Sequence, residues 1–196
     1  HRGLGWAICM VLAGLCLASV PADGQLRVVT YNVADLNGNH AEMKNVLLSL
    51  TEDPAPSTGA IRAPDIYVVQ EMGSSTKNTM LAYLNEMAPL GVTYAIATFT
   101  SNGGGGENAL FYRTDTIVEV TSEHADITNH TGPRATDRWK LRLGQSPDTS
   151  FYVYGSHFKA NWTGDDEAKR ESEANAIRND ADSLGDGQYI MYMGDW

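Results

Sequence analysis

The sequence predicts a mixed α/β sandwich, because helices and strands alternate at both ends of the chain and several strands follow one another between them. The predicted order is strand, helix, strand, helix, then a run of strands, then a helix and a last strand. A doubly wound parallel sheet would instead alternate strands and helices throughout. The chain has 196 residues, enough for one domain with a sizeable core.

Residues 1–24 have the pattern of a secretory signal peptide. Arg2 is the only charge before an apolar run from Trp6 to Val20, and small and turn-forming residues follow it from Pro21 to Gly24. The run is short for a membrane span of ~20 residues. We therefore expect residues 25–196 to form a secreted or periplasmic/extracellular domain with no stable membrane span in its mature form. The alternatives are an apolar element of the fold and a retained membrane anchor.

Composition and charge exclude several kinds of function. Both cysteines, Cys9 and Cys16, lie in the leader, so the predicted mature part has no disulfide, cysteine nucleophile or thiolate metal site. The formal net charge is −10. An acidic protein repels a polyanion over long range, which disfavours a high-affinity, non-enzymatic nucleic-acid binder. It does not disfavour an enzyme that attacks phosphate esters through a bound metal.

The first strand and helix have clear local signals. Leu26 to Tyr31 is β-branched and apolar, and this expected strand ends at Asn32. Asn39 and Glu42 have the spacing of a helix N-cap and capping box. Apolar residues then recur at helical spacing, which predicts an amphipathic helix.

The second strand is the strongest β signal in the chain. Ile66 to Val69 is apolar or aromatic without alternation, which is typical of a strand buried on both faces. It ends in the carboxylate of Glu71. A second helix is predicted from Lys77 to Met87, with Pro89 after it.

The middle of the chain is predicted to be β-structure. Val92 to Phe99 is a strand candidate, and Ala109–Tyr112 with Thr116–Val120 has the form of a hairpin. The glycine loop, Gly103 to Gly106, lies between the strand candidate and the hairpin. In residues 138–143 basic and apolar side chains alternate, which predicts a strand with one face in water.

The C-terminal third is predicted to be a strand, a helix and a strand. Phe151 to Ser156 ends in His157, a helix begins near Thr163, and Tyr189 to Met193 is followed by Asp195. The expected apolar face of the helix consists of Ala174, Ile177, Ala181 and Leu184, with Arg170 on the same side.

Polar residues therefore end four predicted strands: Asn32, Glu71, His157 and Asp195. If these strands lie side by side, their side chains meet at one rim. An amide, an imidazole and two carboxylates are the groups that metal-assisted attack on phosphate requires. Each residue taken singly has an ordinary explanation. Glu71 could form a salt bridge, Asn32 could be a turn residue, and His157 could be a structural histidine.

These strand ends carry a resemblance to a known family. The stretches are V-V-T-Y-N (Val28 to Asn32), P-D-I-Y-V-V-Q-E (Pro64 to Glu71), Y-G-S-H-F-K-A (Tyr154 to Ala160) and Y-M-G-D-W (Tyr192 to Trp196). In this order they resemble signatures of the endonuclease/exonuclease/phosphatase superfamily, the deoxyribonuclease-I-like group. The resemblance covers the chain after the leader. It implies a four-layer α/β/β/α sandwich and a metal-dependent hydrolase of phosphoester bonds.

The resemblance also implies a role for each residue at the rim. Glu71 matches the metal-binding glutamate, and Asn32 the asparagine that helps to orient metal and phosphate. His157 matches the histidine that stabilises or protonates the phosphate, and Asp195 an aspartate that contacts metal or attacking water. The implied metal is Mg²⁺, with Mn²⁺ or Ca²⁺ as alternatives. Arg134 resembles an arginine that contacts the substrate phosphate.

The match to the superfamily pattern is incomplete. Arg138 competes with Arg134 for the phosphate contact, and Trp196 stands where the superfamily has Phe before Asn. A later Asp-His pair, whose histidine acts as general base, has no counterpart after Trp196. We therefore expect a fold truncated before its C-terminal strands, and a fragment that is inactive or nearly so by itself.

Two functions follow as expectations. The first is a secreted, Mg²⁺-dependent nuclease or phosphodiesterase, monomeric, whose phosphoester substrate is a nucleic acid or a phospholipid head group. The second is a non-catalytic extracellular α/β module, or inactive fragment, that retains the fold. An Asn after Trp196 and a downstream Asp-His pair would favour the first.

Overall fold

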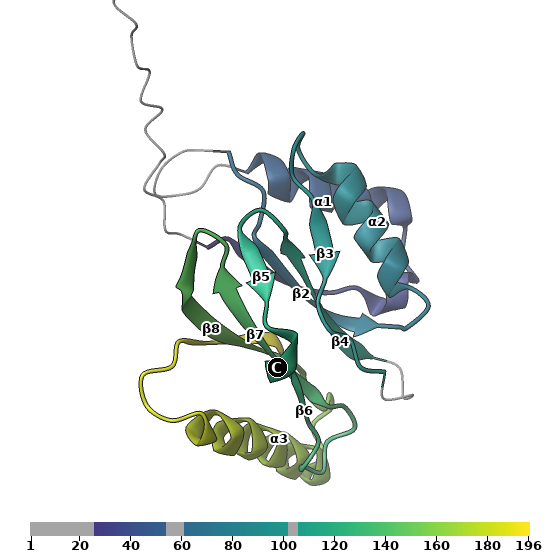
Figure 1. The fold of residues 1–196 in the computed structure, drawn as a ribbon. Helices are drawn as coiled ribbons and strands as arrows, with labels where there is room; N and C mark the ends of the chain where they lie inside the picture. The colour runs from purple at the N-terminus through teal and green to yellow at the C-terminus, as the bar shows by residue number, and fades with distance from the viewer. Residues whose placement is uncertain (1–25, 54–60, 102–105) are drawn as a thin grey trace, which may run out of the picture.

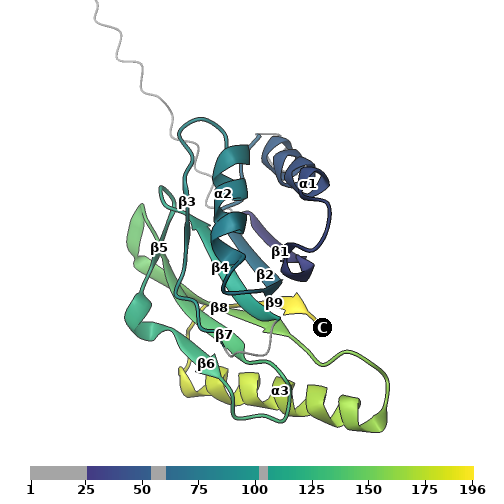
Figure 2. The ribbon, with the colours of Figure 1, turned by 90° about the vertical axis from the view of Figure 1, so that its right-hand side faces the viewer.

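Two β-sheets pack face to face, and helices cover their outer faces (Figure 1). A computed structural model describes residues 26–53, 61–101 and 106–196. The predicted signal peptide (1–24) and nearly all of the glycine loop lie outside the described residues. α1 and α2 cover one sheet and α3 covers the other, which gives the order α/β/β/α (Figure 2).

The first sheet has the strand order β1-β2-β4-β3. β1 (Val28–Asn32) runs parallel to β2 (Ile66–Met72), and β4 (Glu107–Arg113) runs antiparallel to β2. β3 (Tyr94–Ile96) pairs with β4 at the far edge. β2 is buried at every position except Glu71, so the prediction of a strand buried on both faces is confirmed.

Two helices follow the predicted periodicity and pack on the first sheet. α1 (His40–Glu52) begins after Asn39, whose side chain accepts hydrogen bonds from the backbone N–H groups of Ala41 and Glu42. α2 spans Lys77–Met87, the bounds that the sequence predicts. A short 3₁₀ helix, η1 (Ala34–Leu36), joins β1 to α1. No helix in the described ranges is both long and apolar enough to cross a membrane.

The second sheet has the strand order β5-β7-β8-β9, with β6 paired to β7. β8 and β9 are parallel, and α3 (Gly164–Ser183) connects them across the outer face. The strands are β5 (Ile117–Glu119), β6 (Ala125–Ile127), β7 (Thr136–Leu143), β8 (Ser146–His157) and β9 (Ile190–Asp195). A second 3₁₀ helix, η2 (Thr121–Glu123), precedes β6.

The hairpin predicted from Ala109–Tyr112 and Thr116–Val120 is wrong, because β4 and β5 belong to different sheets. Tyr112 pairs with Ile66 in the first sheet, whereas Ile117 pairs with Leu143 in the second. The turn between them carries the chain across the sandwich. Two strands joined by a short turn have the same sequence pattern whether they pair or separate into two layers.

The predicted apolar face of α3 is confirmed at Ile177, Ala181 and Leu184 and is wrong at Ala174. Ala174 is exposed, whereas Ala176, Ile177 and Ala181 pack against the outer face of the second sheet. The same side buries the charged residues Asp166 and Glu173.

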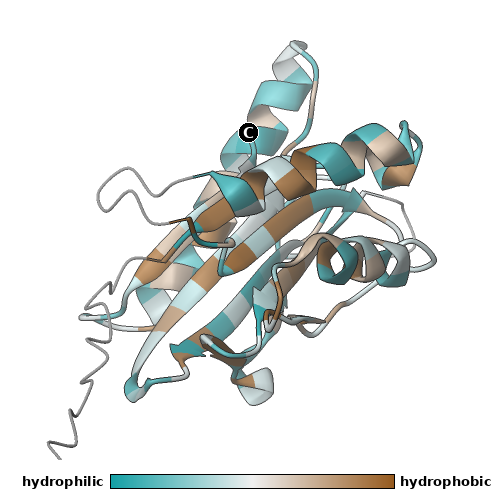
Figure 3. Ribbon diagram, turned by 90° about the horizontal axis from the view of Figure 1, so that it is seen from above, coloured by the Kyte–Doolittle hydropathy of each residue, from teal (hydrophilic) through white to brown (hydrophobic). Residues whose placement is uncertain are grey.

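The predicted wet face of β7 is partly covered, because α3 lies over Arg138. Figure 3 shows apolar positions, in brown, on the strands and on parts of the helices.

The layer between the sheets contains the largest fully buried side chain, that of Trp139. Trp139 and Leu141 of β7 meet Ile66 and Val68 of β2, all fully buried. Gly155 of β8 allows this close approach. A Cβ at Gly155 would lie 2.7 Å from Trp139 Cζ3 and 2.9 Å from Val68 Cγ1.

We predict that Gly155→Ala destabilises the chain by about 1–3 kcal/mol, because the added methyl overpacks the layer between the sheets. The measurement is the urea midpoint of unfolding. Gly164→Ala is the control, since a Cβ there meets no heavy atom within 4 Å. Equal midpoints for the two variants would show that the sheets are not held at this distance.

Candidate active site at the ends of four strands

The structure brings the four predicted strand-end residues together. Asn32 Nδ2 donates to Glu71 Oε1 at 3.0 Å and to Asp195 Oδ2 at 3.0 Å. His157 and Asp195 lie opposite each other on the parallel strands β8 and β9. His157 Nε2 is 3.6 Å from Glu71 Oε1. Figure 2 shows the end of β9 beside the ends of β1 and β2, so the site straddles the two sheets.

A left-handed turn fixes the orientation of Asn32. Its Oδ1 accepts a hydrogen bond from Ala34 N at 3.0 Å, so the amide nitrogen faces the two carboxylates. Ala34, Asp35 and Leu36 have φ values of 46°, 52° and 58°. Such residues cost roughly 1–2 kcal/mol each in the left-handed region. Asp35 Oδ1 holds the turn by accepting from Gly73 N at 3.0 Å and from Thr76 Oγ1 at 2.6 Å.

A β-bulge aims Glu71 at the site. The pairing of β2 with β4 shifts register between Val69 and Met72, and Glu71 has φ 56°. A bulge inserts a residue and redirects a side chain. Gln70 remains buried and bonded to Thr30, while the Glu71 side chain is 36% exposed. Strained backbone on both sides of the Asn32–Glu71 hydrogen bond is typical of a functional site.

His157 is buried beside a cationic arginine. Burial, and next the Arg134 guanidinium, lower the pKa of the His157 imidazole, while the carboxylates of Glu71 and Asp195 act in the opposite direction. The ring is therefore neutral at neutral pH. Arg134 passes close to Gly106, where a Cβ would lie 2.7 Å from Arg134 Nε. The predicted phosphate-contacting arginine thus stands next to the histidine.

Arg138 lies on the other face of the second sheet. Its Nη1 donates to Asp180 Oδ2 of α3 at 2.6 Å, and Tyr154 Oη donates to the same oxygen at 2.6 Å. The Arg138 side chain is 13% exposed. This position between β7 and α3 removes Arg138 as a rival for the phosphate contact.

A hollow of about 430 Å³ adjoins the site. His157 and Asp195 form one side of it, and Lys159 and Trp162 of the loop after β8 form the other, together with Arg170 of α3. Arg170 Nη1 donates to the carbonyl oxygens of Lys159 and Asn161, so it points inward as predicted. Cationic and aromatic side chains suit an anionic ester that carries a planar or apolar group. The sequence analysis assigned no role to Trp162. The only feature of the sequence that points to a role is that Trp162 follows His157 closely along the chain.

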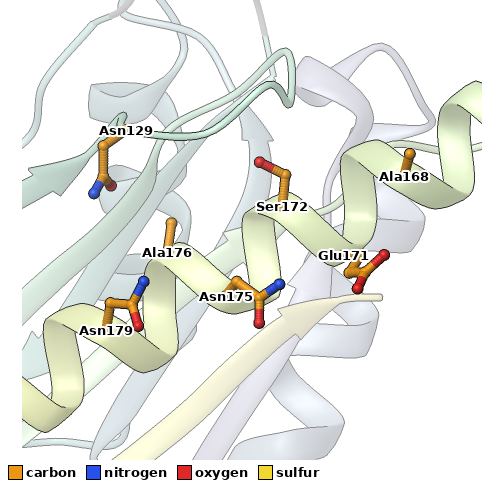
Figure 4. A pocket seen from close by; sticks show the side chains of 7 residues that line it. All are labelled: Asn129, Ala168, Glu171, Ser172, Asn175, Ala176 and Asn179. Carbon is orange, nitrogen blue, oxygen red and sulfur yellow. The ribbon is translucent and has the colours of Figure 1, made fainter.

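A second hollow, of about 370 Å³, lies along α3 (Figure 4). Asn129, from the loop after β6, faces the helix there. The remaining lining residues are Ala168, Glu171, Ser172, Asn175, Ala176 and Asn179. The lining offers amides, one hydroxyl and one carboxylate, with no histidine and no cationic side chain to activate a nucleophile or to bind phosphate.

The residues at the rim fit a hard divalent cation. Glu71 and Asp195 present carboxylate oxygens on either side of one amide, and both are accessible enough for a bound ion to keep water ligands. Mg²⁺ takes one or two carboxylates, several waters and substrate phosphate oxygens. Glu71 and Asp195 would hold the ion, and Asn32 would keep the two carboxylates close together.

No family profile matches the sequence, and no curated protein sequence matches it significantly. Solved structures do match. TDP2 of D. rerio, complexed with a single-strand DNA product, is 15% identical with a TM-score of 0.61 and covers 88% of this chain. The human Nocturnin catalytic domain, with bound sulfate anion, is 18% identical with a TM-score of 0.52 and covers 67%.

A third match carries an inositol phosphate. It is the inositol polyphosphate 5-phosphatase domain of SpSynaptojanin in complex with inositol (1,4)-bisphosphate and calcium ion, 16% identical with a TM-score of 0.55 over 86% of this chain. All three belong to the superfamily that the four motifs resemble. This chain has the deoxyribonuclease-I-like fold. The predicted α/β/β/α sandwich is confirmed, and the chain spans 61%, 51% and 51% of the length of TDP2, Nocturnin and the 5-phosphatase domain.

We predict that Asn32→Asp destabilises the metal-free chain by about 1 kcal/mol, because it replaces a donor shared by two carboxylates with a third negative charge. Added Mg²⁺ should reduce the loss. Thermal unfolding with and without Mg²⁺ measures both effects. Asn37→Asp, at an exposed position of the same loop, is the matched control. If the two variants unfold alike, the amide does not hold the carboxylates together.

Arg138→Met should destabilise the chain by roughly 1–3 kcal/mol, since it leaves the partly buried Asp180 carboxylate without its cation. Arg142→Met is the control on the same strand and face, where the described residues provide no ion pair. Urea unfolding compares them. A loss of catalysis without a loss of stability in Arg138→Met would instead return this arginine to the candidate active site.

Proposed function

We propose that this chain belongs to a Mg²⁺-dependent phosphoester hydrolase of the nuclease or phosphodiesterase type. One observation carries the proposal: Asn32 hydrogen-bonds both Glu71 and Asp195 at the junction of the sheets, next to His157. The fold supports it, because similar structures include TDP2 with a DNA product, a 5-phosphatase with an inositol phosphate, and ANGEL2, a 2′,3′-cyclic phosphatase.

The proposed mechanism divides the work among residues on both sheets. Glu71 and Asp195 would hold the divalent ion, and the ion would supply positive charge that offsets the negative charge of the phosphate. His157 is neutral, so its N–H donates a hydrogen bond to a phosphate oxygen without a proton from solvent. Arg134 stands beside it and contributes a fixed positive charge to the same phosphate.

The substrate proposed is a phosphodiester of a nucleic acid, with a phospholipid head group as the alternative. The hollow next to His157 and Asp195 favours an ester with a planar group, because Trp162 is 96% exposed with Arg170 over its ring. The proposal includes Mn²⁺ or Ca²⁺ as replacement ions, secretion, and a monomeric state. Because the net charge is −10, local positive charge from the bound cation, Arg134, Lys159 and Arg170 would have to attract a polyanion.

The test is hydrolysis of a fluorescent single-stranded DNA and of bis(p-nitrophenyl) phosphate, with and without Mg²⁺. It uses this chain and the longest natural polypeptide that contains it. In the longer polypeptide, we expect Glu71→Gln and His157→Gln each to lower kcat by about 10²–10³, the loss typical of a positioned electrostatic group. Glu52→Gln, exposed at the end of α1, is the matched control and should keep full activity.

Two results would contradict the proposal. Mg²⁺-dependent hydrolysis that survives Glu71→Gln would place the metal elsewhere. A folded, longer polypeptide with no hydrolysis of either substrate would favour a non-catalytic extracellular α/β module with this fold.

A further inference from the structure

A second group of metal-ligand side chains lies where β6 pairs with β7, and it shares no residue with the strand-end site. The group consists of His124, Asp126 and Asp137, here called the β6–β7 triad. One ring nitrogen and two carboxylate oxygens lie within 4.8 Å of one another. His124 Nε2 is 3.6 Å from Asp126 Oδ1 and 3.6 Å from Asp137 Oδ1. These separations are too long for hydrogen bonds.

The backbone places like charges directly against each other in the triad. Asp126 and Asp137 are opposite residues of the antiparallel β6–β7 ladder. His124 precedes Asp126 by two residues, the spacing that puts both side chains on one face. Like charges directly opposite in a sheet are destabilising. A cation bound between the carboxylates converts that repulsion into attraction.

The three atoms that face one another have no other partner. His124 Nε2, Asp126 Oδ1 and Asp137 Oδ1 are buried and form no hydrogen bond within the described residues. Asp137 is only 2% exposed. Leaving such groups unpaired costs roughly 1–3 kcal/mol each, more when they are charged. Three unpaired buried atoms directed at one point indicate a ligand there.

Neighbouring side chains hold the triad in place. Asn108 Nδ2 donates to Asp137 Oδ2 at 3.1 Å, which leaves Oδ1 directed at the histidine. The ring of His124 lies 5.9 Å from that of the buried Trp139. Glu119 adds negative charge near His124, but its two oxygens already accept from Thr98 N. A hydrogen bond to the second oxygen of a ligating carboxylate is the usual support of a metal site.

We propose that the β6–β7 triad binds a divalent transition-metal ion, with Zn²⁺ the best fit, and that this ion fastens β6 to the sandwich. Zn²⁺ takes imidazole nitrogen and carboxylate oxygen at ~2.0–2.2 Å in a tetrahedron, whose edges are therefore ~3.4 Å. The observed separations of 3.6 Å need only a small contraction. Mg²⁺ and Ca²⁺ prefer oxygen-only sites, so the imidazole disfavours them.

A competing arrangement contains no metal. A protonated His124 would neutralise the two carboxylates, or trapped water would bridge the three atoms. Both arrangements predict that a chelator changes nothing and that Zn²⁺ does not bind. Metal binding therefore separates the proposal from both alternatives.

The experiment uses the whole chain after treatment with a chelator. We expect calorimetry to detect one tight Zn²⁺ per chain, Zn²⁺ to raise the unfolding temperature more than Mg²⁺ does, and Co²⁺ to give the visible spectrum of a tetrahedral ion. Asp126→Asn should lower Zn²⁺ affinity about 100-fold. Asp148→Asn, the same change at an exposed strand position, should leave it unchanged.

Further variants keep the test decisive. Glu71→Gln should retain the Zn²⁺ site, which shows that it is separate from the strand-end site. His124→Gln should lose the Co²⁺ spectrum while circular dichroism shows a folded chain, and it replaces Asp126→Asn if that variant unfolds. The proposal is overturned if the folded, stripped wild-type chain binds no Zn²⁺, or if Asp126→Asn binds it as tightly as wild type.

Discussion

The amide of Asn32 is the contact on which the rest of the site depends. It donates at 3.0 Å to a carboxylate of the first sheet and at 3.0 Å to a carboxylate of the second. Two carboxylates are thereby held close together, and a cation bound between them would offset their repulsion. The left-handed turn after Asn32 and the bulge at Glu71 are local strain that this arrangement requires. Strain of that kind persists only where surrounding contacts determine it.

The layer between the sheets has an apolar end and a polar end. Trp139 and Leu141 fill the apolar end. Further along β7, Asp137 is buried and accepts a hydrogen bond of 3.1 Å from Asn108 of the first sheet. Burial at the polar end strengthens electrostatic interactions. Both the strand-end site and the β6–β7 triad therefore lie where the sandwich stops being hydrophobic.

Much of the fold could be predicted because its signals are local. The Asn39 cap and the bounds of α2 follow from side chains within one turn, and the burial of β2 follows from its composition. The separation of β4 from β5 could not be predicted, because a short turn looks the same in either topology. The buried face of α3 was wrong at Ala174, since the orientation of a helix is set by what it packs against. For the candidate site, the four strand-end residues were predicted, but the hollow at Trp162 was not.

The sequence by itself determined which residue types end the strands, since each of Asn32, Glu71, His157 and Asp195 follows an apolar run. Only the tertiary structure decided between the two arginines, by placing Arg138 against Asp180 and Arg134 beside His157. It alone brought Asp137 to His124 and Asp126. Strand pairing joins residues that are distant in the chain, and no local pattern encodes which strands pair. The sequence supplies the residue types, and the packing of the two sheets brings them within contact of one another.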